Sequence, residues 1–281
     1  MDVANREQAE HWAAVAPAWL EIEDHLERMA GEPGREAMDR LGIGPGQRVL
    51  DLGCGAGPTT VELARRVGPD GSVLGVDIAT EMLARARQRA AQEGAANVSF
   101  VHADVQSYDL GLGAYDRAFS RFGVMFYVDP VAAFSNVRRA LGAGGALGFV
   151  CWQHVTANEW MLIPGMAVMS VTGRPLAVPE PGQPGPFSLC DIDRVHQVLD
   201  LAGFAEVEVI PRDDVVSVPD GEVLDYARGA LRMGAARDAL KEADEATEAR
   251  AFESVAAALG EKVHGGQLRL TRGVLVVTAR V

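Results

Sequence analysis

An apolar run followed by three alternating glycines is the most informative stretch of the sequence. It reads Val49-Leu50-Asp51-Leu52-Gly53-Cys54-Gly55-Ala56-Gly57. Glycines after a strand let the backbone turn sharply and approach a ligand, because no Cβ stands in the way. The spacing is GxGxG rather than the GxGxxG of dinucleotide sites. Asp51 lies two residues before the first glycine, where an anion would oppose a pyrophosphate but suit an ammonium group.

Two further carboxylates follow the next two predicted strands. Gly75-Val76-Asp77 places one of them where it can accept hydrogen bonds from both ribose hydroxyls of an adenosine. Ala103-Asp104-Val105 places the other where it can receive the exocyclic amine of adenine. Either acid alone could be a helix cap or a solvated loop carboxylate. Three acids at consecutive strand ends behind a glycine loop favour an adenosine ligand.

These motifs resemble those of class I S-adenosylmethionine-dependent methyltransferases. VLDLGCGAG resembles the first motif of that family, GVD the second and HADV the third. The similarity covers residues 45–152, and a weaker likeness extends through Gly203-Phe204 to the last predicted strand. The branch that looks most similar methylates small molecules, as the ubiquinone and menaquinone C-methyltransferases do, and it has relatives in natural-product pathways.

The resemblance implies which residues bind S-adenosylmethionine as the cofactor. Asp51 would meet its amino group, directly or through water. Gly53, Cys54 and Gly55 would line its methionyl end, and Asp77 would hold the ribose.

The adenine would be bound by a second set of residues. The resemblance implies that Ile78 and Met82 pack on the ring, and that Asp104 with Val105 recognises its amine.

The stretch after the fourth predicted strand separates classes of methyltransferase. It reads Ser120-Arg121-Phe122-Gly123-Val124-Met125-Phe126, and by resemblance Ser120 and Arg121 would face the sulfonium and the substrate. Enzymes that methylate DNA bases, and many that act on RNA or protein amides, carry an Asn or Asp with two prolines and an aromatic residue here. The different motif indicates a small, hydrophobic or aromatic substrate, with oxygen, carbon or nitrogen as the acceptor atom.

Methyl transfer is an in-line displacement, so the protein mainly positions the acceptor roughly 3 Å from the methyl group and excludes water. A hydroxyl or activated-carbon acceptor also needs a base. We predict His154, two residues past the fifth strand, as that catalytic residue, with His11 as the competitor. A loop histidine can equally be a surface side chain without a catalytic role.

Aromatic residues from segments that flank the strand ends are predicted to form the substrate-binding wall, because open α/β sheets bind ligands there. The predicted substrate-binding residues are Trp12, Trp19, Phe122, Phe126, Trp152 and Trp160, with Tyr127, Met161, Met166 and Met169 as further candidates for the wall. Such residues are also ordinary core material in many proteins.

Short β-rich runs alternate with longer helical patterns between Gln47 and Trp152, as is typical of βαβ units. The expected strands are Arg48–Leu52, Ser72–Asp77, Val98–His102, Asp116–Ser120 and Ala146–Trp152. The predicted fold is therefore α/β, with a Rossmann-like, mostly parallel sheet and helices on both faces. The resemblance implies seven strands, with Leu268–Val281 as an antiparallel last strand.

Residues 1–44 are predicted to form an N-terminal helical cap, and residues 45–281 the methyltransferase domain. Pro17 should kink or split the first helix, and the Gly31-Glu32-Pro33-Gly34 cluster should break the cap again. Residues 153–189 are predicted to be a lid and substrate insertion, whose helix is interrupted at Pro164. A helix capped by Asp191 follows.

The rest of the chain is expected to hold a strand at Glu206–Ile210 and then two helices with Gly234 between them, before the last strand.

Composition excludes several classes of protein. The 281 residues are 48% hydrophobic and 23% charged, so a disordered or fibrous chain is excluded. The net charge of −13 repels phosphate backbones, so no nucleic-acid partner is expected. No secretory signal or membrane-spanning run is expected. Three widely spaced cysteines fit a reducing cytosol without a metal site. We thus expect a cytoplasmic monomer or homodimer with a small-molecule substrate.

Two other functions remain open from the sequence. A nicotinamide-dependent oxidoreductase also carries a glycine loop and an acid after its second strand, although the GxGxG spacing and Asp51 speak against it. A protein that binds S-adenosylmethionine without transferring its methyl group would have the same motifs.

Overall fold

The computed structural model describes residues 6–176 and 182–281, and its centre is one eight-stranded sheet. Seven strands follow the order β3-β2-β1-β4-β5-β8-β6, and the short β7 pairs with β8. Strands β1 to β5 are parallel, whereas β8 runs antiparallel to β5 and β6. The strands are β1 Arg48–Leu52, β2 Ser72–Asp77, β3 Val98–His102, β4 Tyr115–Arg121, β5 Leu141–Trp152, β6 Ala205–Pro219, β7 Val263–His264 and β8 Gln267–Arg280. This arrangement confirms the predicted Rossmann-like fold.

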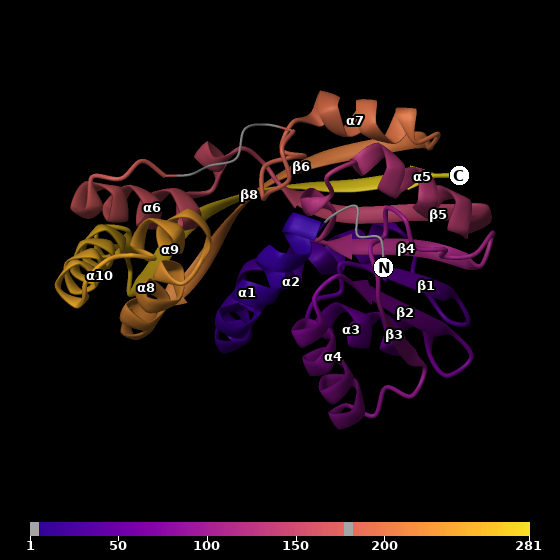
Figure 1. Ribbon diagram of the computed structural model, residues 1–281, viewed down its shortest axis with the longest axis horizontal. Helices are drawn as coiled ribbons and strands as arrows, with labels where there is room; N and C mark the ends of the chain where they lie inside the picture. Colours follow the sequence, from indigo (N-terminus) through magenta and orange to yellow (C-terminus); the bar gives the residue numbers. More distant parts are fainter. Residues whose placement is uncertain (1–5, 177–181) are drawn as a thin grey trace.

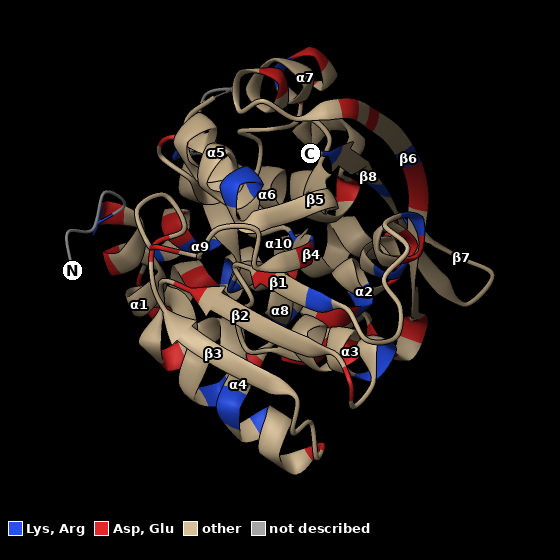
Figure 2. Ribbon diagram, turned by 90° about the vertical axis from the view of Figure 1, so that its right-hand side faces the viewer, with Lys and Arg blue, Asp and Glu red and all other residues tan. Residues whose placement is uncertain are grey.

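Helices cover both faces of the sheet. Helices α2, α3 and α4 lie on one face, and α5 and α7 lie on the other (Figure 2). Their bounds are α2 Glu23–Arg40, α3 Pro58–Val67, α4 Thr80–Gln92, α5 Pro130–Ala140 and α7 Ile192–Leu201. The predicted cap of α7 is confirmed, because the Asp191 carboxylate accepts a hydrogen bond from the Arg194 backbone N–H at 2.9 Å.

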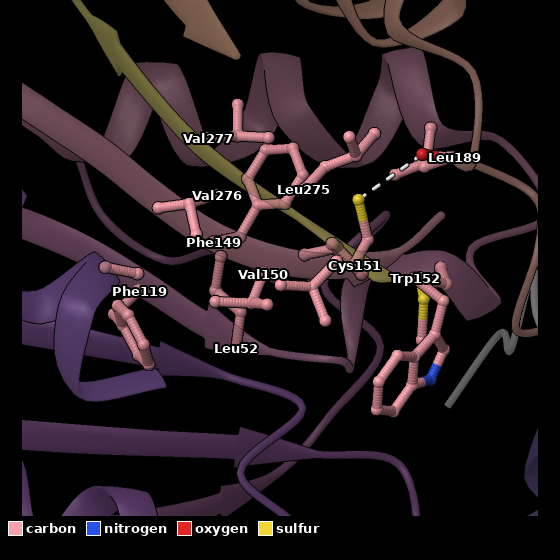
Figure 3. Packing of buried hydrophobic residues seen from close by; sticks show 14 of the residues in the cluster. Leu52, Phe119, Phe149, Val150, Cys151, Trp152, Leu189, Leu275, Val276 and Val277 are labelled. Atoms are coloured by element: carbon pink, nitrogen blue, oxygen red, sulfur yellow. Dashed lines mark hydrogen bonds between the residues drawn. The ribbon is translucent and has the colours of Figure 1, made fainter. Parts of the chain in front are cut away.

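The hydrophobic core lies between these helices and the central strands, which are mostly tan in Figure 2. Figure 3 shows Phe119, Phe149 and Leu275 packed around the β4–β5–β8 part of the sheet. The Cys151 thiol, also buried there, donates to the Leu189 carbonyl at 3.3 Å and so ties β5 to the segment before α7. The described helices include none with both the length and the apolar composition that a membrane crossing requires.

The N-terminal helices differ from the sequence prediction. Helix α1, Arg6–Glu21, continues through Pro17, and α2 continues through the Gly31–Gly34 cluster; the helical path is interrupted at Ile22 instead. Pro33 cannot donate to the carbonyl of Met29, four residues earlier. The Arg272 guanidinium donates to that carbonyl at 2.9 Å, so the loss is compensated from β8. The predicted break at residues 31–34 is therefore wrong, and of the kink or split predicted at Pro17 the split is wrong.

A second group of helices lies beyond the carboxyl ends of the parallel strands (Figure 1). It consists of α6 Glu159–Thr172, α8 Val223–Leu231, α9 Gly234–Leu240 and α10 Glu245–Gly260. The predicted interruption at Pro164 is wrong, since α6 runs through it; packing of α6 on α9 and α10 outweighs the local cost of the proline. Gly234 begins α9, so three helices occupy the stretch predicted to hold two. Residues 177–181 of the predicted insertion lie outside the described residues.

A two-stranded ribbon carries three of these helices. Strand β6 was predicted to span Glu206–Ile210, but it continues to Pro219 because β8 pairs with it along its whole length. Trp152, the last residue of β5, is paired with Val274, so residues 267–273 of β8 project past the end of β5. At ~3.4 Å per residue the ribbon reaches roughly 20 Å beyond the sheet. Helices α8, α9 and α10 connect its two strands.

We expect Arg272→Met to lower the free energy of unfolding by about 2–3 kcal/mol, because the Met29 carbonyl loses its donor. Arg272, which is 2% exposed, also forms ion pairs with Glu32 and Asp214. The control is Arg280→Met, which removes an exposed ion pair with Glu206 and should change stability by less than about 0.5 kcal/mol. Urea denaturation measures both variants. If Arg272→Met and Arg280→Met changed the free energy of unfolding by the same amount, Arg272 would not stabilise α2.

Candidate active site

The turn after β1 and the turn after β4 touch through their backbones. A Cβ at Gly53 would lie 2.9 Å from the Gly123 Cα, and one at Gly123 would lie 2.8 Å from the Leu52 carbonyl oxygen. Gly53 also has a φ of 67°, which L-residues rarely adopt. Glycine at both positions therefore lets the two turns share one side of a cavity.

Asp51 is a buried carboxylate behind the glycine loop. It is 1% exposed, and its Oδ2 accepts a hydrogen bond from Thr60 Oγ1 at 2.6 Å. Its Oδ1 is buried without a hydrogen-bond partner among the described residues. Burial raises the pKa of Asp51 to about 7, while the Thr60 hydrogen bond and the charge of Arg121 act in the opposite direction.

Asp77 is the last residue of β2, and Asp104 lies just after β3. Both carboxylates accept hydrogen bonds from residues close to them in the structure. Asp77 accepts from the backbone N–H of Gly55 at 2.8 Å and of Ala79 at 2.9 Å. Burial raises its pKa, although these backbone hydrogen bonds oppose the shift. Asp104 accepts from the backbone N–H of Gln106 at 2.9 Å and from its side-chain amide at 3.2 Å.

A cavity of about 570 Å³ lies at the carboxyl ends of these strands. Nine predicted cofactor-binding residues line it: Gly53, Cys54, Gly55, Asp77, Ile78, Met82, Asp104, Val105 and Arg121. Asp51 and Ser120 are not in the lining. The Ser120 hydroxyl is fully buried and donates to the Leu52 carbonyl at 2.7 Å, so it links β4 to β1.

The six predicted substrate-binding aromatics line the same cavity in two clusters. Trp12 lies 5.1 Å from Trp19 and 4.9 Å from Phe126, centroid to centroid. In the second cluster, the ring of Trp152 is stacked on Phe122 at 4.0 Å and lies 4.8 Å from Trp160.

The other candidates for the wall divide between the cavity and the surface. Tyr127 and Met161 line the cavity, and the Tyr127 hydroxyl is buried without a partner among the described residues. Met166 and Met169 are 52% and 38% exposed and lie outside the lining, because they occupy the outer face of α6.

Comparison with known proteins identifies the domain that contains this loop. Residues 49–145 match the family described as "Methyltransferase domain". The chain is 34% identical to an aklanonic acid methyltransferase of Streptomyces sp. over 41% of this chain and 53% of that relative. It is 28% identical to the nocamycin O-methyltransferase of Saccharothrix syringae over 68% of this chain and 70% of that relative. Residues 49–145 are thus similar to methyltransferase domains.

A solved structure shows the same fold around this methyltransferase domain. The YcgJ protein of Bacillus subtilis superimposes with a TM-score of 0.59 at 13% identity, over 89% of this chain and 98% of that one. The chain spans about half the length of several curated relatives that it matches.

The residues of the methyltransferase domain fit S-adenosylmethionine. The free Oδ1 of Asp51 is a buried acceptor that suits an ammonium group. The glycine loop presents backbone to the cavity, and Asp77 and Asp104 place two carboxylates on its wall. Asp51 lies behind the lining, so its negative charge would act on the amino group through water or at short range.

The two candidate catalytic histidines lie in different places. His154, predicted from the sequence, is exposed outside the lining, and its Nδ1 lies 3.0 Å from the Thr156 hydroxyl. His11 is exposed as well, but it lines the cavity. Partial burial lowers the pKa of His11, and the charge of Arg237 lowers it further.

Part of the cavity wall comes from α8, α9 and the turn between them, which the sequence motifs did not predict. Ala230, Met233, Ala236, Arg237 and Asp238 line the cavity. One sequence signal could have revealed them. An antiparallel strand as long as Leu268–Val281 must extend beyond the carboxyl ends of its parallel neighbours, and whatever precedes it then lies over the ligand site.

The pKa of Asp51 predicts how its substitution depends on pH. An acid with a raised native pKa binds its proton more tightly when folded, so its contribution to stability falls as pH rises from about 4 to about 7. The Asp51→Asn variant has no such titrating group. Its free energy of unfolding, relative to that of wild type, should therefore rise by about 2–3 kcal/mol between pH 5 and pH 8.

Urea denaturation at the two pH values measures this difference. Asp116→Asn is the control, because the ion pair with Arg48 lowers the pKa of Asp116 and its titration lies below this range. A difference between Asp51→Asn and wild type that is equal at pH 5 and pH 8 would contradict the prediction.

Proposed function

We propose that this protein transfers the methyl group of S-adenosylmethionine to a small, hydrophobic or aromatic acceptor. One observation carries the proposal: a single cavity joins the glycine loop and its carboxylates to two clusters of aromatic side chains. Donor and acceptor would therefore meet in one apolar space. The names of the aklanonic acid and nocamycin methyltransferases support a small-molecule acceptor.

The protein's own residues would mainly position the reactants and exclude water. S-adenosylmethionine supplies a methyl group that its sulfonium charge activates. Asp77 and Asp104 would orient the adenosine, and the aromatic rings would hold the acceptor and shield the site. Phe122 has a φ of 60°, a strained value for this residue, and this backbone places its ring against Trp152.

His11 is the histidine that the geometry favours as the general base. It lines the cavity, and its lowered pKa keeps the imidazole neutral and able to accept a proton at pH 7. His154 remains the alternative from the sequence. We further propose that the protein acts in the cytoplasm, as a monomer or homodimer, without nucleic acid.

Label transfer tests the proposed function. The purified protein is incubated with methyl-labelled S-adenosylmethionine and either a small-molecule extract or a macromolecular fraction of the source cells. Label in an organic-soluble product is expected, because the cavity wall is largely apolar. Label in precipitated macromolecules would overturn the substrate class. Cofactor binding without any label transfer would favour the non-transferring alternative, and binding of reduced nicotinamide cofactor would favour the oxidoreductase.

A pair of histidine variants separates the two candidate bases. With the acceptor that the label identifies, His11→Gln should lower kcat by at least ~100-fold, a typical contribution of general-base catalysis. It should also remove the loss of rate toward acid pH that protonation of His11 is expected to cause in wild type. His154→Gln is the matched comparison and should keep wild-type kcat. The reverse result would assign the base to His154, and full activity of both variants would exclude a histidine base.

A further inference from the structure

Arg121 lies in the cavity wall, and some N–H groups of its guanidinium have no hydrogen-bond acceptor among the described residues. Its side chain is 12% exposed, and its Nη1 forms an ion pair with Glu27 Oε2 at 2.8 Å. Its Nε and Nη2 make no hydrogen bond to residues within 6–176 and 182–281. Another cation of the lining, Arg89, donates from Nη2 to Glu23 at 2.7 Å, and only its Nε is buried without a partner among the described residues. Arg121 therefore keeps guanidinium donors for a ligand.

Helix α2 provides both the space and the counter-charge for this side chain. A Cβ at Gly34 would lie 2.7 Å from Arg121 Cδ, so a larger residue at position 34 would displace the arginine. Glu27, on the same helix, occupies only one end of the guanidinium. Arg121 is thus held at the end of β4 with its remaining donors free.

Arg121 acts electrostatically on Asp51, because its positive charge opposes the rise that burial causes in the pKa of that carboxyl group. Asp51 precedes Gly53 by two residues, and Arg121 precedes Gly123 by two, the two glycines whose backbones touch. An α-amino acid carries an ammonium and a carboxylate on one carbon, so two neighbouring charges of opposite sign match it. A guanidinium can bind a carboxylate through two parallel hydrogen bonds.

We propose that Arg121 binds the carboxylate of the methionyl group of S-adenosylmethionine, while the charge of Asp51 attracts the ammonium group. The inference rests on the proposed function and adds the recognition of the amino-acid end. It differs from the sequence prediction that Arg121 faces the sulfonium. A guanidinium without a counter-charge would repel the positively charged sulfonium. Glu27 and the bound carboxylate would neutralise the charge of the guanidinium.

Calorimetry with two ligands tests this role without any measurement of activity. The ligands are S-adenosylhomocysteine and its decarboxylated analogue, which retains the adenosine, the thioether and the amine. Wild type should bind S-adenosylhomocysteine at least ~10-fold more tightly, as a charge-assisted hydrogen bond implies. In Arg121→Met the preference should fall below about 3-fold, because only the ligand with a carboxylate loses a partner.

Arg48→Met is the matched control. It removes an arginine that is paired with Asp116 at the opposite end of the same sheet, and it should keep the wild-type preference. If Arg121→Met also kept that preference, the inference would be overturned. A wild-type protein that binds neither ligand would overturn the proposed function and this inference together, which distinguishes the two failures.

A second variant keeps the test valid if Arg121→Met does not fold. Glu27→Gln leaves Arg121 in place and removes the charge that competes for it. The preference for the ligand with a carboxylate should then increase relative to wild type. An unchanged or smaller preference would contradict the role of Arg121.

Discussion

The site depends on the backbone contact between Gly53 and Gly123. With any side chain at either position, the turns after β1 and β4 would separate, because the contact leaves less than 3.0 Å for a Cβ. The β1 turn is also held from its other side, where the backbone N–H groups of Gly53 and Cys54 donate to the Val76 carbonyl. These constraints hold together the ends of three strands, which carry Asp51 behind the cavity lining and Asp77 and Arg121 within it.

The N-terminal helices depend on a long-range compensation. Pro33 leaves the Met29 carbonyl without its helical donor, and Arg272 of β8 supplies one. The same guanidinium pairs with Glu32 and Asp214, so it joins α2 to the β6–β8 ribbon. Because α2 also carries Gly34 and Glu27, this compensation positions the residues that surround Arg121. Stability of the cap and geometry of the cavity are therefore linked.

The cavity is assembled from parts that are distant in the sequence. The strand ends supply the glycine loop and the carboxylates, α1 supplies Trp12 and Trp19, and α6, α8 and α9 supply the opposite wall. Helices α8 and α9 arrive there because the β6–β8 ribbon extends past the end of β5 (Figure 1). Substrate choice would then be set by the helices, while residues at the strand ends would bind the cofactor. With such a division, different substrate-binding walls can be combined with the same binding site for the methyl donor.

The sequence by itself determined the parallel sheet, the glycine loop and the aromatic residues of the cavity wall. Strands β1, β2 and β3 have their predicted bounds, since apolar alternation and turn residues are local signals. Tertiary structure decided that α2 and α6 continue through their prolines, because Arg272 and the packing of α6 on α9 and α10 come from distant segments. It also decided that His11 rather than His154 lines the cavity, and that α8 and α9 complete the wall. Which residues surround a cavity depends on contacts between segments that are far apart in the chain, and local sequence patterns do not encode those contacts.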